Sequence, residues 1–163
     1  MTERNRRLKR MQGNDKKTVE LENALQAEIN AQGSLEKFLK EQGIFEDEYY
    51  AYMSDLLYEK GYNKEQIYKK ANISRSYGRK ILGGETGVGL AKRDYIIRIA
   101  YVADFKLIEV NRALKLAGLS ELYVKVPRDA ALIVAFNKGI ANRNLDDLNE
   151  YLKGYGFESL DKN

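Results

Sequence analysis

Six polar side chains between positions 64 and 80 have the types and the spacing to hold a polyanion. They are Lys64, Ser74, Arg75, Ser76, Arg79 and Lys80. An arginine can donate two parallel hydrogen bonds to guanine or to a phosphate, and lysine and serine can donate to base edges or phosphate oxygens. The chemistry expected of this group is therefore recognition by hydrogen bonding, without the making or breaking of covalent bonds.

Four of these side chains lie on one face if the segment from Arg75 to Leu82 is a helix. At about 100° per residue, its polar residues fall within about 140° of one another and its bulky residues fall opposite. The polar face holds Arg75, Ser76, Arg79 and Lys80, and the opposite face holds Tyr77, Gly78 and Ile81. The alternative is an ordinary amphipathic helix, on which charged side chains face outward only because they are soluble.

Local signals predict two short helices that would position this face. Asn63 is an N-cap residue with Gln66 three positions later, which predicts a helix running to about Ala71. Asn72 provides the turn, because asparagine tolerates the left-handed conformation, and Ser74 caps the second helix. Gly83 and Gly84 end it. Two helices of this length joined by a tight turn are typical of a helix-turn-helix unit.

The remaining pattern predicts further helices and no convincing β-hairpin. We expect helices over residues 16–31, 34–43, 46–60, 93–103, 107–117, 128–138 and 144–153. The apolar run Ala130 to Phe136 could also be a buried strand, but its helical neighbours favour a helix. The glycine-rich stretch Gly83 to Gly89 lacks the Gly-Lys-Ser/Thr ending of a phosphate-binding loop, so a connecting loop is expected there.

Positive charge is concentrated in two segments. Residues 1–17 hold seven Lys and Arg against Glu3 and Asp15, and residues 64–93 hold eight against Glu65 and Glu85. Between them, residues 18–63 hold three basic residues against ten acidic ones, and residues 94–163 are balanced. A chain with this distribution can present a localised basic face to a nucleic acid.

The composition removes several classes of function. The chain has no Cys and no His, which excludes disulfides, thiolate chemistry and the commonest metal ligands. We therefore expect no enzyme, no catalytic residue, no metal and no cofactor. No apolar stretch has the length of a membrane span and no secretory signal opens the chain, so a cytoplasmic protein without a membrane partner is expected.

The segment Asn63 to Gly84 resembles the helix-turn-helix of XRE-type regulators, the lambda repressor and Cro-like family. It is most similar to a bacterial branch with an Arg-x-Tyr-Gly recognition helix, and the resemblance covers about residues 48 to 156. The positions that carry it are Arg75, Tyr77, Gly78, Gly84, Arg93, Asp94, Leu114, Ala117, Gly118, Leu119, Arg128, Asp129, Asn149, Glu150 and Leu152. The resemblance implies an all-α, lambda-repressor-like fold that binds DNA to regulate transcription.

The chain departs from that family at three positions. Many XRE proteins have Ala in place of Tyr68, Gly in place of Asn72, and Val or Ile in place of Gly78. We expect Tyr68 and Gly78 to be a compensated pair, with a large side chain packed against a small one. The loop from Glu85 to Ala91 also lacks the basic and proline residues usual in the family.

We expect one helix-turn-helix bundle with helical extensions at both ends. Residues 1–43 would form a basic arm and an N-terminal extension, residues 44–120 the DNA-binding domain, and residues 121–163 a C-terminal extension. The expected function is a sequence-specific transcriptional regulator that binds double-stranded DNA as a homodimer, since two-fold operators mirror two-fold proteins. The alternative is an adaptor or antitoxin-like module that docks another protein through its C-terminal helices.

Overall fold

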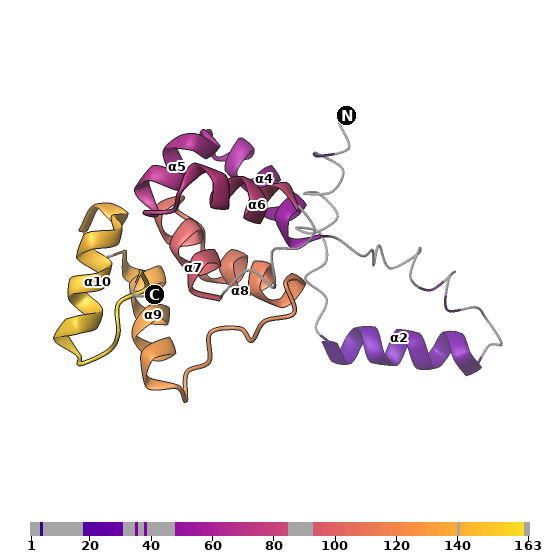
Figure 1. The fold of residues 1–163 in the computed structure, drawn as a ribbon. Helices are drawn as coiled ribbons and strands as arrows, with labels where there is room; N and C mark the ends of the chain where they lie inside the picture. The colour runs from indigo at the N-terminus through magenta and orange to yellow at the C-terminus, as the bar shows by residue number, and fades with distance from the viewer. Residues whose placement is uncertain are drawn as a thin grey trace. The chain divides into compact units, whose positions relative to one another are not determined.

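A computed structural model of the chain describes residues 4, 18–30, 35, 38, 48–84, 93–139 and 141–161. Every regular element in these ranges is helical, which confirms the all-α prediction. The helices are α2 (Thr18–Asn30), α4 (Tyr49–Glu59), α5 (Lys64–Lys70), α6 (Arg75–Gly83), α7 (Arg93–Val102), α8 (Leu107–Leu116), α9 (Pro127–Lys138), the 3₁₀ turn η1 (Ala141–Arg143) and α10 (Leu145–Gly154) (Figure 1). None of them combines the length and apolarity that crossing a bilayer requires.

The chain divides into two units, residues 1–47 and 48–163. The first contributes α2, which confirms the helix predicted over residues 16–31. The basic arm and the helix expected over 34–43 lie outside the described residues, apart from Arg4, Leu35 and Phe38. The loop from Glu85 to Ala91 lies outside them as well. The second unit contains α4 to α10 and therefore spans both the predicted DNA-binding segment and the predicted C-terminal extension.

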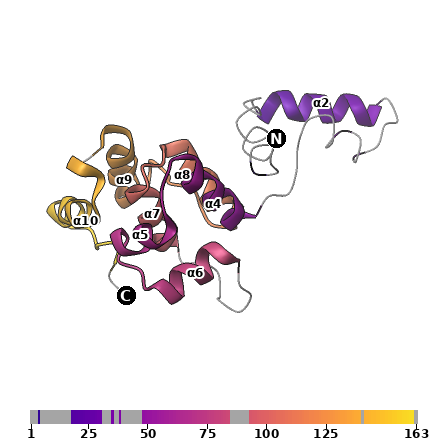
Figure 2. The ribbon, with the colours of Figure 1, turned by 90° about the horizontal axis from the view of Figure 1, so that it is seen from above.

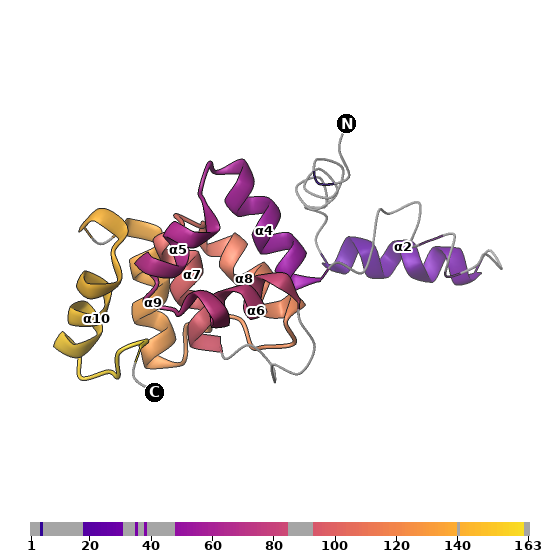
Figure 3. The ribbon, with the colours of Figure 1, turned by 45° about the horizontal axis from the view of Figure 1, so that its top comes forward.

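Helix α7 is the centre of the second unit. It contacts α5, α8 and α10, and α4 packs on both α6 and α8. Seven consecutive residues of α7, from Ile96 to Val102, are buried. A helix that is buried all round needs apolar residues on every face, and α7 has them except at Arg98. The core therefore surrounds a single short helix, while α9 and α10 lie side by side at one end of the unit (Figure 3).

Helix starts and ends follow the predicted signals. The run Ala130 to Phe136 is helical, as favoured, and Pro127 occupies the first position of α9, where its missing N–H costs nothing. In α8, which confirms the helix predicted over residues 107–117, the side chains of Val110, Ala113 and Leu114 are buried. Asn144 caps α10 by accepting a hydrogen bond from the Asp147 amide at 2.8 Å. Such local signals determine where the helices of the unit begin and end.

Helices α7 and α8 with the segment after them are repeated by α9 and α10 with theirs. In the first half, Asn111 Oδ1 accepts a hydrogen bond from the Leu122 amide at 2.9 Å. In the second half, Asn149 Oδ1 accepts one from the Leu160 amide, also at 2.9 Å and also eleven residues away. The two repeats pack on each other through equivalent pairs of helices, because α7 contacts α10 and α8 contacts α9. The unit therefore contains an internal two-helix repeat.

Reciprocal ion pairs join the two repeats at their Arg-Asp starts. Arg93 donates to both carboxylate oxygens of Asp129, at 2.9 and 2.7 Å. Arg128 donates to both carboxylate oxygens of Asp94, at 3.0 and 3.1 Å. Each arginine also donates to carbonyl oxygens of its own repeat's closing segment: Ser120 and Glu121 for Arg93, Glu158 and Ser159 for Arg128. The two dipeptides thus exchange partners across the repeat boundary.

The outer faces of the two repeats differ in their exposure. Ile99 in α7 is fully buried, whereas Val134, at the same position in α9 counted from the Arg-Asp start, is 44% exposed. Ala117, just before Gly118, is 8% exposed, whereas Tyr155, just before Gly156, is 66% exposed. Helices α4 and α5 pack on the first repeat, and the corresponding face of the second repeat faces outward.

Candidate nucleic-acid interface

Helices α5 and α6 form a capped pair joined by residues 71–74. The Asn63 side chain accepts hydrogen bonds from the amides of Glu65 and Gln66, and Ser74 Oγ accepts one from the Tyr77 amide at 3.2 Å. Asn72 adopts the left-handed conformation with φ of 53°. These contacts confirm the predicted caps and turn. Helix α6 lies at the outer edge of its unit when viewed from above (Figure 2).

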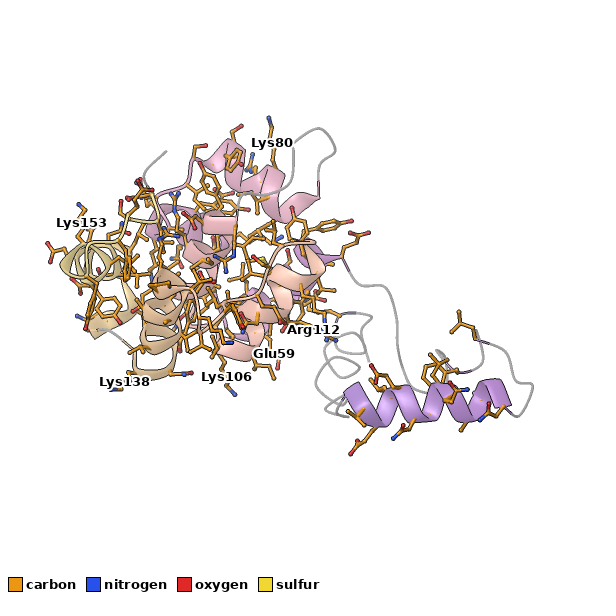
Figure 4. All side chains as sticks on the ribbon, turned by 90° about the horizontal axis from the view of Figure 1, so that it is seen from below. Glu59, Lys80, Lys106, Arg112, Lys138 and Lys153 are labelled. Carbon is orange, nitrogen blue, oxygen red and sulfur yellow. The ribbon has the colours of Figure 1, made fainter. Side chains whose placement is uncertain are left out.

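The two faces of α6 are those predicted from the sequence. Gly78, Ile81 and Leu82 are buried, and Tyr77 is half-buried against the ring of Tyr95, with the ring centroids 4.7 Å apart. The outward face presents the exposed side chains Arg75, Ser76, Arg79 and Lys80. Lys80 projects from the unit on the side opposite to Lys106 and Lys138 (Figure 4). The four expected contact residues of the helix therefore share one accessible surface.

The ring of Tyr68 determines how closely α6 approaches α5. A Cβ atom built on Gly78 would lie 2.6 Å from Cγ and Cε1 of that ring, closer than real Cβ contacts. The predicted pairing of a large Tyr68 with a small Gly78 is therefore confirmed. Gly84, in the left-handed conformation with φ of 66°, is covered in the same way by Tyr50 of α4. The rings of Tyr68 and Tyr50 thus pack closely against α6 at Gly78 and at Gly84.

Glu65 forms ion pairs with both arginines of the outward face. Its Oε2 lies 2.9 Å from Arg75 Nε, and its Oε1 lies 3.3 Å from Arg79 Nη2. The arginine side chains remain 66% and 53% exposed. Because arginine has five N–H donors, one carboxylate restrains each guanidinium without using all of its donors. The sequence showed Glu65 only as an acidic residue in a basic segment, and its bridging position depends on the angle between α5 and α6.

The other two expected contact residues lie at helix starts. Lys64 is the first residue of α5 and is exposed. Ser74 is exposed, but its hydroxyl oxygen is already the cap of α6, so its side chain has a structural role in addition to any contact it makes. Together with the outward face of α6, these residues form a continuous polar surface over the starts of both helices. We call this set, Lys64, Ser74, Arg75, Ser76, Arg79 and Lys80, the α6 surface.

The buried Arg98 holds the α5–α6 turn by hydrogen bonds to its backbone. This residue was not identified from the sequence. Arg98 is 2% exposed and donates from Nε to the Ala71 carbonyl at 2.9 Å, and from Nη2 to the Asn72 carbonyl. Its guanidinium lies 4.7 Å from the ring centroid of Tyr95. Burial lowers the pKa of Arg98 below its ordinary value, while Tyr95, Asp161 and Asp94 oppose that change. The one signal in the sequence was a charged residue inside an otherwise apolar helix.

The C-terminal segment also reaches this turn. Asp161 accepts hydrogen bonds from Asn149 Nδ2 at 3.0 Å and from Asn72 Nδ2 at 3.4 Å. The end of the second repeat is thereby connected to the turn that sets the orientation of α6. Comparison of the chain with known protein families, with curated proteins and with solved structures finds no match.

Proposed function

We propose that α5 and α6 are the helix-turn-helix of a lambda-repressor-like domain, and that the α6 surface binds the major groove of duplex DNA. The observation that carries this proposal is the separation of α6 into two faces. Its buried face packs against Tyr68 and α4, which determines the side of the helix that faces outward, and its exposed face presents Arg75, Ser76, Arg79 and Lys80. A rigid helix that displays donors on one face is suited to reading base edges.

The roles of the side chains follow from their chemistry. Arg75 and Arg79 are held by Glu65, so their guanidinium planes are restrained before contact, which reduces the entropy lost on forming bidentate bonds to guanine. Lys64 and Lys80 are flexible point charges and suit phosphate oxygens. Glu65 is a positioning residue in this scheme, because it acts through the arginines. The scheme requires no cofactor, no metal and no catalytic residue.

A regulator of this kind would act in the cytoplasm as a homodimer, because one short helix reads only a few base pairs. The outward face of the second repeat, with Val134 and Tyr155 exposed, is the surface we assign to the second copy. The same face supports the competing function, in which the C-terminal helices dock another protein as an adaptor or antitoxin-like module. In either case the net charge of residues 94–163 is zero, which suits a protein contact better than a phosphate contact.

The dependence of binding on salt separates the two functions. Each phosphate that the protein neutralises releases condensed counterions, so the slope of log affinity against log salt is about −0.9 per contact on duplex DNA. We expect a steep slope for the full chain on nonspecific duplex, and selection from a random duplex library should then return one preferred sequence. A flat slope together with no selected sequence would reject DNA binding and favour the docking function.

Arg75→Ala is expected to weaken binding to the selected duplex by about 1 to 3 kcal/mol, because it removes a restrained bidentate donor. The thermal melting midpoint should hardly change, since the side chain is 66% exposed. The substitution also frees Glu65 from one partner, so it should be repeated in a Glu65→Gln background to separate the two effects. Fluorescence anisotropy on specific and scrambled duplexes measures the loss.

Lys106→Ala is the matched control, because Lys106 is an exposed cation on the side of the unit opposite to Lys80 (Figure 4). We expect it to leave the affinity unchanged. If Arg75→Ala and Lys106→Ala bound every duplex equally well, α6 would not be the reading helix.

A further inference from the structure

A cavity in the second unit is lined in part by the α5–α6 turn and contains no residue of the α6 surface. Its volume is about 730 Å³, within the range of small-molecule sites. The end of α5, the end of α7, η1 and the start of α10 line it, and the residues that matter below are Lys69, Lys70, Asn72, Asp104, Asn142 and Arg143. Nothing in the DNA-binding scheme uses this cavity.

Left-handed backbone conformations are concentrated around this cavity. Four described residues other than glycine have positive φ, and all four line it: Asn72 at 53°, Asp104 at 60°, Asn142 at 64° and Arg143 at 50°. Asn72 and Asp104 follow the ends of α5 and α7, where a left-handed residue is a common helix ending, so Arg143 is the unusual case and needs surrounding contacts to hold it. For Arg143 the contacts are hydrogen bonds to the carbonyl oxygens of Tyr101, Phe105 and Phe136, at 3.3, 3.2 and 3.0 Å.

Comparison of the two repeats shows that part of the cavity wall is an addition to the second repeat. Helix α7 is followed by a short turn before α8, whereas α9 and α10 are separated by a longer connection that contains η1. The additional residues bring Asn142 and Arg143 to the cavity. The first repeat connects α7 to α8 without an equivalent of Asn142 and Arg143. The packing of a two-helix repeat therefore does not itself require these two residues.

The lining indicates which ligand would fit. Lys69 and Lys70 supply two ammonium groups from the last turn of α5, and Lys70 Nζ lies 5.7 Å from the ring centroid of Tyr62. The lining also contains side-chain amides and the carboxylates of Asp104 and Asp146, which can accept hydrogen bonds from hydroxyl groups. The Asp104 carboxylate is held by Arg143 at 3.5 Å, which offsets its repulsion of an anion.

We propose that this cavity binds a small phosphorylated polyol, such as a sugar phosphate. The phosphate would lie against Lys69 and Lys70, and the hydroxyl groups against the amides and Asp146. Lysine suits a phosphate as a point charge, and a small number of placed polar groups fixes the orientation of the rest. Neither Lys69 nor Lys70 belongs to the α6 surface.

Asn72 connects the cavity to the helix pair. It lines the cavity, sits at the left-handed position of the α5–α6 turn and donates to Asp161. A ligand that changes this turn would change the orientation of α6. This coupling rests on the proposed DNA binding, and linkage then requires that DNA change the ligand's affinity by the same factor. Ligand binding itself is measured without DNA, so the two proposals fail separately.

The test is calorimetric titration of the full chain with ribose 5-phosphate, ribose and inorganic phosphate at fixed ionic strength. We expect ribose 5-phosphate to bind about tenfold or more tightly than either of the other two. The double variant Lys69→Gln and Lys70→Gln should weaken ribose 5-phosphate by about tenfold or more. The matched control is Lys138→Gln with Lys153→Gln, which removes two exposed lysines from the last turns of α9 and α10 (Figure 4).

The control should bind ribose 5-phosphate as the parent does. Equal affinity for ribose 5-phosphate and inorganic phosphate would overturn the proposal, as would an equal loss in the two double variants or no binding of ribose 5-phosphate at millimolar concentration. Both lysine pairs are exposed, so we expect all variants to fold. Circular dichroism of each variant checks this.

Discussion

Arg93→Ala is expected to lower the free energy of unfolding by about 3 to 5 kcal/mol, the loss typical of a broken buried ion pair. Its partner Asp129 has a side chain only 6% exposed, and it would stay buried without the guanidinium that now donates to both of its oxygens. The variant also loses the two bonds to the carbonyls of Ser120 and Glu121. Urea denaturation followed by circular dichroism measures the change.

Arg128→Ala is the matched control that the internal repeat supplies. Arg128 makes the equivalent contacts, but its partner Asp94 has a side chain 35% exposed, so water can replace much of what is lost. We expect a loss of about 1 to 2 kcal/mol for this variant. Equal losses at the two positions would show that burial of the carboxylate does not set the cost.

The pH dependence gives a second readout of the same pair. Burial alone would raise the pKa of Asp129, but hydrogen bonds from Arg93 and the Tyr123 amide, with the charges of Arg93 and Arg128, hold the pKa below its ordinary 3.8. A carboxyl with a lowered pKa stabilises the fold above its ordinary pKa, and this stability is lost as the pH falls through the folded value.

In Arg93→Ala the sign reverses. Burial would then raise the pKa of Asp129, so protonation would favour the folded state. The difference in stability between parent and variant should therefore narrow as the pH falls from 7 toward 3. A constant difference over that range would mean that Asp129 is not the group that carries the loss.

The features that could be predicted from the sequence are those encoded locally. Apolar spacing and capping residues predicted α5, α6 and the turn at Asn72, because each signal lies within a few residues of what it specifies. The rotation of α6 could also be predicted, since 100° per residue fixes which side chains oppose Ile81. The contact between Tyr68 and Gly78 could be predicted because α5 and α6 adjoin in sequence.

The features that could not be predicted depend on the angles at which helices pack against one another. The Glu65 bridge to Arg75 and Arg79 requires the crossing of α5 and α6, and neither charge pattern nor periodicity reports that angle. The exchange between the two Arg-Asp dipeptides requires the packing of the two repeats, in which α7 contacts α10 and α8 contacts α9. The cavity is further still from local signals, since Lys69, Asp104 and Asn142 meet only in the folded unit.

Ile81→Asp is expected to unfold the second unit or to destabilise it by about 4 kcal/mol or more, the range reached when a charge is buried without a partner. Ile81 is fully buried on the inner face of α6, which packs on α4 and α5. Its aspartate would have to be neutralised or the helix displaced, and a small domain has only about 5 to 15 kcal/mol in total. Thermal melting followed by circular dichroism is the measurement.

Lys80→Asp makes the same new carboxylate one residue earlier, on the exposed face, and reverses a charge of the α6 surface. We expect its melting midpoint to stay within a few degrees of the parent's, since exposed substitutions change stability by about 0.5 kcal/mol. Its affinity for duplex DNA should fall, whereas Ile81→Asp should lose structure and binding together. If Lys80→Asp unfolded the unit and Ile81→Asp melted like the parent, the faces of α6 would be reversed, and with them the surface we assign to DNA.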